Sequence, residues 1–230
     1  MNRLRQFPAA ILIAAMLVFM SIIGSACSGD NGPTTFPTSP TSNPDNLPTV
    51  LSRTADLNSV TYDVITALPN HSQTTSRVWL IKDQVKIESE IDGETKTAFI
   101  DYQAETYHVF TEGDRYAIKY AFDLDALGLS LLDKTLNISN YNATTTGSET
   151  LEGKECLVVE YNQDNTPVKT WLWKETGFPL RSEITQAGGT TVVEYKNVSF
   201  DLPDTSAVSL PANMMVIDLS KEYNTPDYPF

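Results

Sequence analysis

Short runs rich in β-branched and aromatic residues, separated by turn residues, fill most of the sequence from residue 58 to residue 200. The separators include "PNHS", "DG" and "EGD". Such runs are typical of strands, and their close spacing predicts antiparallel meanders. The predicted strands are "SVTYDVITAL", "TTSRVWLIKD", "QVKIESEI", "TKTAFID", "ETYHVFTE" and "RYAIKYAF", and later "NYNATTTGSE", "KECLVVEYNQ", "PVKTWLWKE", "PLRSEITQ" and "TTVVEYKNVSF".

Two segments have helical rather than strand periodicity. Residues 47–57, "LPTVLSRTADL", place Leu47, Val50 and Leu51 on one face, and proline is tolerated in a first turn. Residues 123–136, "DLDALGLSLLDKTL", begin with an aspartate and are apolar over more than half of the helix circumference. We therefore expect two short helices, and the second of them requires cover on two sides.

Several predicted strands carry apolar side chains on both faces. Trp79 and Ile81 alternate with Val78 and Leu80, and the same pattern recurs in "TWLW" around Leu172. An antiparallel sheet with one face in water would alternate apolar with polar residues. Two folds satisfy the pattern: a strongly curved sheet whose concave side holds helices and a guest molecule, or a fully packed two-layer fold without a cavity.

The amino terminus has the layout of a secretory signal. Arg3 and Arg5 precede an almost wholly apolar run from residue 7 to residue 23, and small residues follow at positions 24 to 26. Cleavage before Cys27, with a lipid attached to its thiol, is one outcome, although Gly24 stands where such cleavage sites usually have leucine. The other outcomes are ordinary cleavage and an uncut signal anchor.

Residues 28–46, "SGDNGPTTFPTSPTSNPDN", favour the lipidated outcome. They contain four prolines and seven serines or threonines, so they cannot bury a core and are expected to form an extended tether. A tether of this length reaches at most ~60 Å. The predicted organisation is a signal peptide at 1–26, an acylated Cys27 with its tether at 27–46, and one domain at 47–230.

Charge and residue content exclude several function classes. Loss of Arg3 and Arg5 with the signal takes the formal net charge from -13 to -15, which argues against nucleic acid as a partner. Cys156 lacks a nearby histidine or second cysteine and is expected to be a small core residue. His71 and His108 have no nucleophile beside them, and Asp123 and Asp125 do not fit a calcium loop. We therefore expect no enzyme activity, no metal and no cofactor.

The order of helix, strands, central helix and further strands resembles the LolA/LolB-like lipoprotein-carrier superfamily. The resemblance covers roughly residues 47–220 and is carried by "SVTYDV", "VWLIKDQVKIESEIDGE", "AFIDYQAETYHVF", "LEGKECLVVEY", "TWLWKETGFPLRSE" and "SFDLPDTSAVSLPANMMVID", of which "WLWKETGFPLR" is the most specific. It implies a mainly β fold in which a curved antiparallel sheet forms a half-open barrel covered by a few helices.

The resemblance also implies a cavity able to take acyl chains. By position its lining residues are Trp79, Ile81, Ile87, Phe99, Trp171 and Trp173, with Leu127 and Leu131 of the central helix as a plug. The expected function is that of a membrane-anchored exported lipoprotein which binds a lipid or another hydrophobic molecule. The alternative is an envelope protein that uses the same curved sheet to bind a polypeptide partner.

Overall fold

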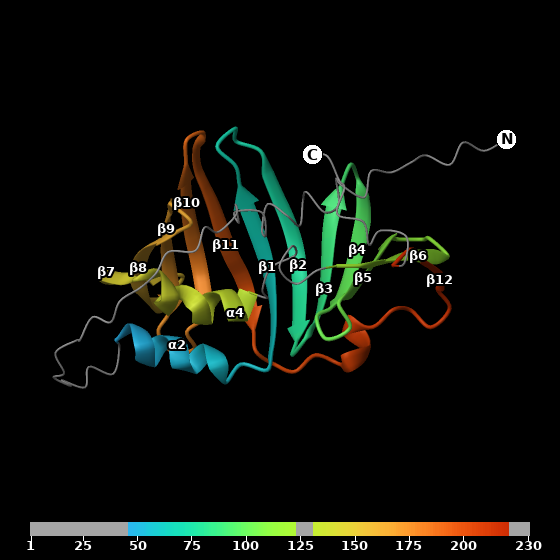
Figure 1. Cartoon of the computed structure of the whole chain (residues 1–230), viewed down its shortest axis with the longest axis horizontal. Coiled ribbons are helices and arrows are strands. Elements are labelled where there is room, and N and C mark those ends of the chain that lie inside the picture. The colour runs from blue at the N-terminus through green and yellow to red at the C-terminus, as the bar shows by residue number, and fades with distance from the viewer. Residues whose placement is uncertain (1–45, 123–130, 221–230) are drawn as a thin grey trace, which may run out of the picture.

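The computed structural model describes residues 46–122 and 131–220. Its core is one sheet of twelve strands in the order β12-β6-β5-β4-β3-β2-β1-β11-β10-β9-β8-β7. The sheet is curved and open, with β12 and β7 as its two edges (Figure 1). The predicted fold, a mainly β half-open barrel with a few helices, is confirmed.

The strands are β1 (Ser59–Ala67), β2 (Gln73–Ile81), β3 (Gln84–Ile91), β4 (Glu94–Asp101), β5 (Thr106–Thr111), β6 (Tyr116–Ala121), β7 (Thr144–Leu151), β8 (Lys154–Gln163), β9 (Thr166–Trp173), β10 (Pro179–Gln186), β11 (Gly189–Ser199) and β12 (Met215–Asp218). The described helices are α2 (Leu47–Ala55) and α4 (Leu131–Leu136), with two 3-10 turns, η1 (Asn137–Tyr141) and η2 (Thr205–Val208).

The sheet consists of two antiparallel meanders, β1–β6 and β7–β11, which meet where β1 pairs with β11. Tight turns fix the register inside each meander. Asp92 and Gly93 join β3 to β4 with φ of 54° and 77°, and Ile91 pairs directly with Glu94. Two successive positive φ values are the geometry that matches the twist of a hairpin, and Asp-Gly supplies it at low cost.

Strand β12 departs from the meander pattern because it runs parallel to β6, with Met215 beside Tyr116 and Asp218 beside Lys119. The chain leaves β11, passes through η2, which packs against β2 and β3, and then follows β6 in the same direction. The apolar "MMVIDL" segment of the sequence is therefore an edge strand.

The expected helix over residues 47–57 is observed as α2, which ends two residues earlier at Ala55. Asn46 caps it, since its side-chain oxygen accepts a hydrogen bond of 3.0 Å from the Thr49 amide. The buried side chains of α2 are Val50, Leu51 and Thr54. Of the second expected helix, 123–136, the described part is α4, and residues 123–130 lie outside the described residues.

The two faces of β1–β6 differ in character, and the register defines them. One face, called the inner face here, carries Val60, Leu80, Val85, Ile100, Tyr107 and Tyr120, which are successive partners from β1 to β6. The outer face carries Trp79, Lys86, Phe99, His108 and Lys119, again as successive partners. Leu132 of α4 packs with the inner-face side chains in the main core.

The described helices cover only part of the sheet. In Figure 1, α4 lies in front of the strands on the β10–β1 side and α2 lies below α4, while neither of them lies in front of β3–β6. In the described part of the chain, no helix has the length and apolar character needed to cross a membrane.

Candidate functional site

The inner face is buried on β1 and β2 but only in part on β3–β6, where Val85, Ile100 and Tyr107 are buried and their neighbours are less so. On β1 and β2, Val60 is 0% exposed and Leu80 is 2% exposed. On β3, β5 and β6, by contrast, Ile87, Val109 and Tyr120 are only partly buried although they pack against the same core. The inner face of β3–β6 therefore presents apolar side chains that the described helices do not fully cover.

Aromatic rings line the end of this face nearest α4. Tyr107 of β5 stacks on Tyr120 of β6 with a centroid distance of 5.1 Å and an interplanar angle of 22°. Phe122 contacts Tyr107 at 6.3 Å and Tyr102 at 5.9 Å. Aromatic rings bury a large area per side chain and can contact both acyl chains and ring systems.

Helix α4 borders the aromatic cluster. Leu131 packs partly buried against the main core, next to the fully packed Leu132. Burial of the Tyr102 phenol, together with the nearby carboxylate of Asp133 in α4, raises the pKa of Tyr102 to about 12. The site therefore has an apolar wall, an aromatic end and a short helix beside it.

The outer face has a different chemistry, in which cations lie over aromatic rings. The Lys86 ammonium lies 4.5 Å from the ring centroid of Trp79, and the Arg77 guanidinium lies 5.3 Å from it. Lys86 also approaches Phe99, whose ring stacks on Phe110 at 6.0 Å. These cation-π contacts cover the outer aromatic rings with cations, so the outer face is less apolar than its aromatic content suggests.

The residues that the sequence assigns to a cavity do not share one face of the sheet. Ile87 lies on the inner face, beside Ala98 of β4, and Leu131 lies on α4. Trp79, Ile81 and Phe99 lie on the outer face, on alternate positions from the inner residues. Leu127 and Cys27 lie outside the described residues. A ligand on the inner face would contact Ile87 and Leu131 but not the outer three.

The two remaining predicted lining residues have local partners at the other end of the sheet. The indole of Trp171 is 5% exposed and donates a hydrogen bond of 2.9 Å from Nε1 to Glu149 Oε2. Lys169 lies 4.9 Å from the Trp171 ring centroid. Trp173 packs against Phe200 at 5.8 Å. Both tryptophans are packed into the β7–β11 half of the molecule.

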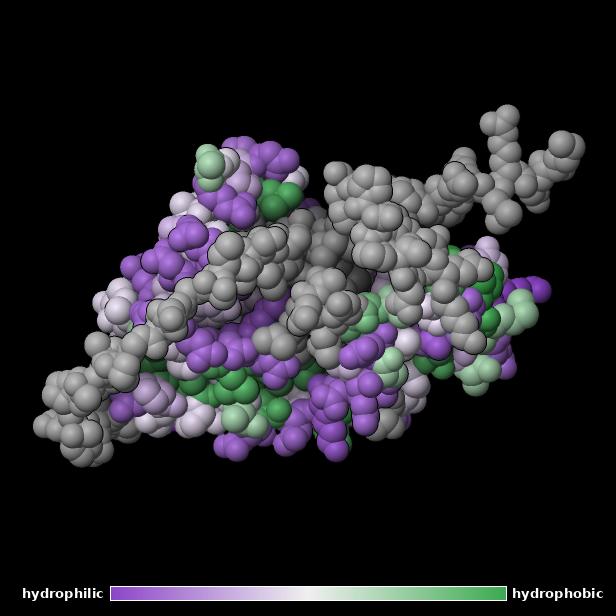
Figure 2. All heavy atoms as spheres, viewed as in Figure 1, coloured by the Kyte–Doolittle hydropathy of each residue, from purple (hydrophilic) through white to green (hydrophobic). Residues whose placement is uncertain are grey.

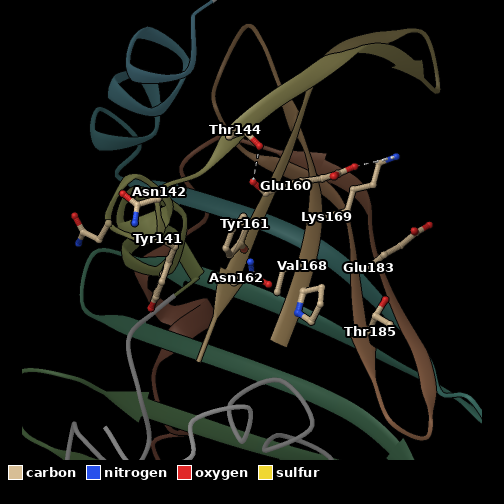
Figure 3. Close-up of a pocket in the computed structure, with 12 residues that line it drawn as sticks. Tyr141, Asn142, Thr144, Glu160, Tyr161, Asn162, Val168, Lys169, Glu183 and Thr185 are labelled. Carbon is tan, nitrogen blue, oxygen red and sulfur yellow. Dashed lines mark hydrogen bonds and ion pairs between the residues drawn. The ribbon is translucent and has the colours of Figure 1, made fainter. Parts of the chain in front are cut away.

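A hollow of about 790 Å³ lies between η1 and the strands β8–β10 (Figure 3). Tyr141 and Tyr161 stack at its side with centroids 5.7 Å apart. Glu160 and Lys169, which also line it, form an ion pair of 3.8 Å. Polar and apolar atoms share the exposed lining about equally, so this hollow offers a mixed surface rather than a continuous apolar wall.

Candidate metal ligands are scattered over the described residues. No three histidine, cysteine, aspartate or glutamate side chains come together there as a metal site would require. Cys156 is 0% exposed, as the sequence indicates, and burial raises the pKa of its thiol. His71 is exposed in the turn between β1 and β2, and His108 lies on the outer face with its pKa lowered, first by burial and then by Lys119.

Comparisons with known proteins show a likeness of fold. No protein-family model matches the sequence, and no curated protein matches it. A solved structure of an uncharacterised conserved protein from Thermus thermophilus has a TM-score of 0.53 at 10% identity, over 74% of this chain and 96% of that chain. At this identity the match establishes a shared fold and carries nothing about activity.

Two further solved structures match less well. LprF from Mycobacterium bovis has a TM-score of 0.46 at 13% identity, over 68% of this chain and 92% of that chain. MucB, solved in complex with MucA from Pseudomonas aeruginosa, has a TM-score of 0.43 at 14% identity, over 74% of this chain and 63% of that chain. Both are too distant to support an inference about this chain.

Sequence patterns did not identify the half-buried inner-face residues, chiefly Val109, Tyr120 and Phe122. In "ETYHVFTE" both alternating sets are apolar or aromatic, so period-two alternation separates them without telling which set faces inward. Pairing of Tyr107 with Ile100 and Tyr120 resolves the ambiguity. The register, and not composition, identifies the candidate site.

Proposed function

We propose that this protein is an exported lipoprotein that binds a lipid or another hydrophobic molecule against the inner face of β3–β6. One observation carries the proposal: this face continues the apolar core, yet Ile87, Val109 and Tyr120 on it are only partly buried. Half-buried apolar surface on a concave sheet is the usual chemistry of a hydrophobic binding site. The proposed role is binding or carriage, without catalysis.

The amino-terminal sequence supports a place at the outer surface of a membrane. In the proposal the signal is removed, acylated Cys27 anchors the chain, and residues 28–46 hold the domain away from the lipid. Two or three acyl chains on one cysteine give firm attachment, whereas a single chain binds weakly. The resemblance to the LolA/LolB-like carriers agrees with this arrangement.

The energetics of the inner face suit an acyl chain. A strand of eight residues is ~26 Å long, which matches an extended chain laid beside it. Burial of ten methylenes contributes ~8 kcal/mol before the costs of association are subtracted. The aromatic cluster of Tyr102, Tyr107, Tyr120 and Phe122 would contact the end of the chain nearest α4.

The test compares two substitutions on neighbouring residues of β5. Val109→Trp adds a large ring to the inner face, and Phe110→Trp places the same indole on the outer face with a smaller change in volume. Loss of contact with two or three methylenes corresponds to ~2 kcal/mol, so Val109→Trp should weaken fatty-acid binding about thirtyfold. Phe110→Trp should leave binding unchanged.

The measurements are native mass spectra of the chain purified from ordinary phospholipid membranes, before and after solvent extraction, and displacement of a fluorescent fatty acid. A co-purifying lipid that is lost on extraction and is weakly retained by Val109→Trp supports the proposal. A lipid-free mass with no fatty-acid uptake overturns it, and cross-linking to an envelope protein would then test the polypeptide-binding alternative. Equal fatty-acid binding by both variants would show that the ligand binds somewhere other than the inner face of β3–β6.

A further inference from the structure

Exposed large apolar side chains concentrate at one edge of the sheet. In the described residues, four of the five lie on β12 or beside it: Tyr116 is 43% exposed, Met215 63%, Val216 45% and Ile217 47%. Figure 2 shows apolar surface at the end of the molecule where β6 and β12 lie. Edge strands of soluble proteins normally carry charged residues or proline there, so an edge with three consecutive apolar residues indicates an interface.

The backbone of β12 has one paired side and one side without a partner among the described strands. The Met215 amide donates to the Arg115 carbonyl at 3.0 Å, and the Leu219 amide donates to the Lys119 carbonyl at 2.9 Å. Backbone groups alternate in direction along a strand, so residues 215, 217 and 219 face β6. The amides and carbonyls of Val216 and Asp218 therefore face away from the sheet.

We propose that a second copy of this chain pairs with this edge, antiparallel, about a two-fold axis at Ile217. In this register Val216 of each copy lies opposite Asp218 of the other, so all four outward amides donate to outward carbonyls. Ile217 meets its symmetry equivalent at a non-hydrogen-bonded position, where side chains are closest. The register centred on Asp218 would oppose two carboxylates and is disfavoured.

The charges beside the edge agree with this register. The Asp218 carboxylate accepts a hydrogen bond of 3.1 Å from Lys119 on β6 and further hydrogen bonds from the Ser220 amide and hydroxyl. It is therefore balanced within its own chain and adds no unpaired charge beside Val216 of the other copy. Charged residues on an edge strand usually prevent another strand from pairing with it. Here the Asp218 charge is neutralised by Lys119 of the same copy, so it does not prevent pairing.

Pairing would also join the two inner faces. Met215 pairs with Tyr116 and Ile217 with Ile118, which places both β12 side chains on the inner side of the sheet. The two Ile217 side chains would cover one another at the junction. The inner faces of the two copies would then form one continuous surface across the junction.

The interface is small, which predicts a concentration-dependent dimer. Four apolar side chains per copy cannot bury the roughly 1,200 Å² typical of a standard stable interface. Attachment of both copies to one membrane raises their effective concentration without any new contact. We therefore expect dimers on membranes and in concentrated solution, with monomers in dilute solution.

The experiment uses cysteine pairs in the full chain, purified and incorporated into phosphatidylcholine vesicles. At a non-hydrogen-bonded pair the Cα atoms are about 4.5 Å apart, within disulfide range, so Ile217→Cys should cross-link to its equivalent under mild oxidant. In the same register two Val216→Cys residues lie diagonally, about 7–8 Å apart. We expect Ile217→Cys to form covalent dimer at least about tenfold faster than Val216→Cys.

The parent chain, which keeps Cys27 and Cys156, gives the background rate. Sedimentation velocity over a concentration series gives the second readout: Val216→Lys should abolish reversible dimers, and Ser148→Lys on the opposite edge strand β7 should not. Equal cross-linking of the two cysteine variants overturns the register, and a monomer at every concentration overturns the dimer. Neither readout involves a hydrophobic ligand, so failure here leaves the proposed function untouched.

Discussion

Gly177 lies in the turn between β9 and β10, where α2 approaches most closely. Its φ is +73°, and a Cβ atom there would collide with the Val50 carbonyl oxygen and with Oγ1 of Thr54. Gly177→Ala therefore incurs two costs, about 1–2 kcal/mol for a left-handed alanine and about 1–3 kcal/mol for displaced packing. We expect the free energy of unfolding to fall by about 2–5 kcal/mol.

Gly93→Ala is the matched control. Its φ of +77° is nearly the same, but no atom lies within 4 Å of an added Cβ, so only the backbone cost of about 1–2 kcal/mol applies. Urea unfolding followed by tryptophan fluorescence measures both variants, and the difference between them reports the contact with α2. If the two variants lose equal stability, α2 does not press on the β9–β10 turn as described.

Two further predictions concern the phenol beside α4 and the amino terminus. The pKa of Tyr102 is raised to about 12, first by burial and then by Asp133, above the ordinary value near 10. The stability contribution of the neutral phenol is complete below pH ~10 and is lost as pH rises to about 12, so urea unfolding should show a fall in stability that Tyr102→Phe reduces; an unchanged fall refutes the assignment. Mass spectrometry of the mature chain should find acylated Cys27 at its amino terminus, and a start elsewhere refutes the anchor.

The strand order of the two meanders could be predicted because each turn has its own sequence signal. "DG" at residues 92–93 and "AGGT" at residues 187–190 lie at observed hairpin turns, and neighbouring strands in the chain are neighbours in the sheet. The helix at residues 47–55 could also be predicted. Asn46 caps it, Pro48 suits its first turn, and Val50 and Leu51 form its apolar face. Turns and helix caps are set by residues adjacent in the sequence, so they can be predicted without knowing which strands pair.

The identity of the inner face could not be predicted, because it depends on pairing between distant strands. Trp79 and Phe99 are large and apolar, which favoured them as lining residues, yet the strand register places both on the outer face, beside Lys86. The cation over each ring comes from a neighbouring strand, so the sequence around the aromatic residue does not reveal it. The parallel pairing of β12 with β6 was inaccessible for the same reason.

The proposed function assigns stability and ligand binding to different halves of one sheet. The largest fully buried side chains, among them Val50, Val60, Leu172 and Phe178, lie on α2, β1, β2, β8 and β9 and just before β10, and none lies on β3–β6. A half packed to completion can hold the fold, while a half with incompletely covered apolar residues can exchange a guest without unfolding the rest. Helix α2 contacts Gly177 in the packed half. The proposed tether leads into α2, so it would attach the domain to the membrane through the packed half, and the inner face of β3–β6 would stay accessible to a ligand.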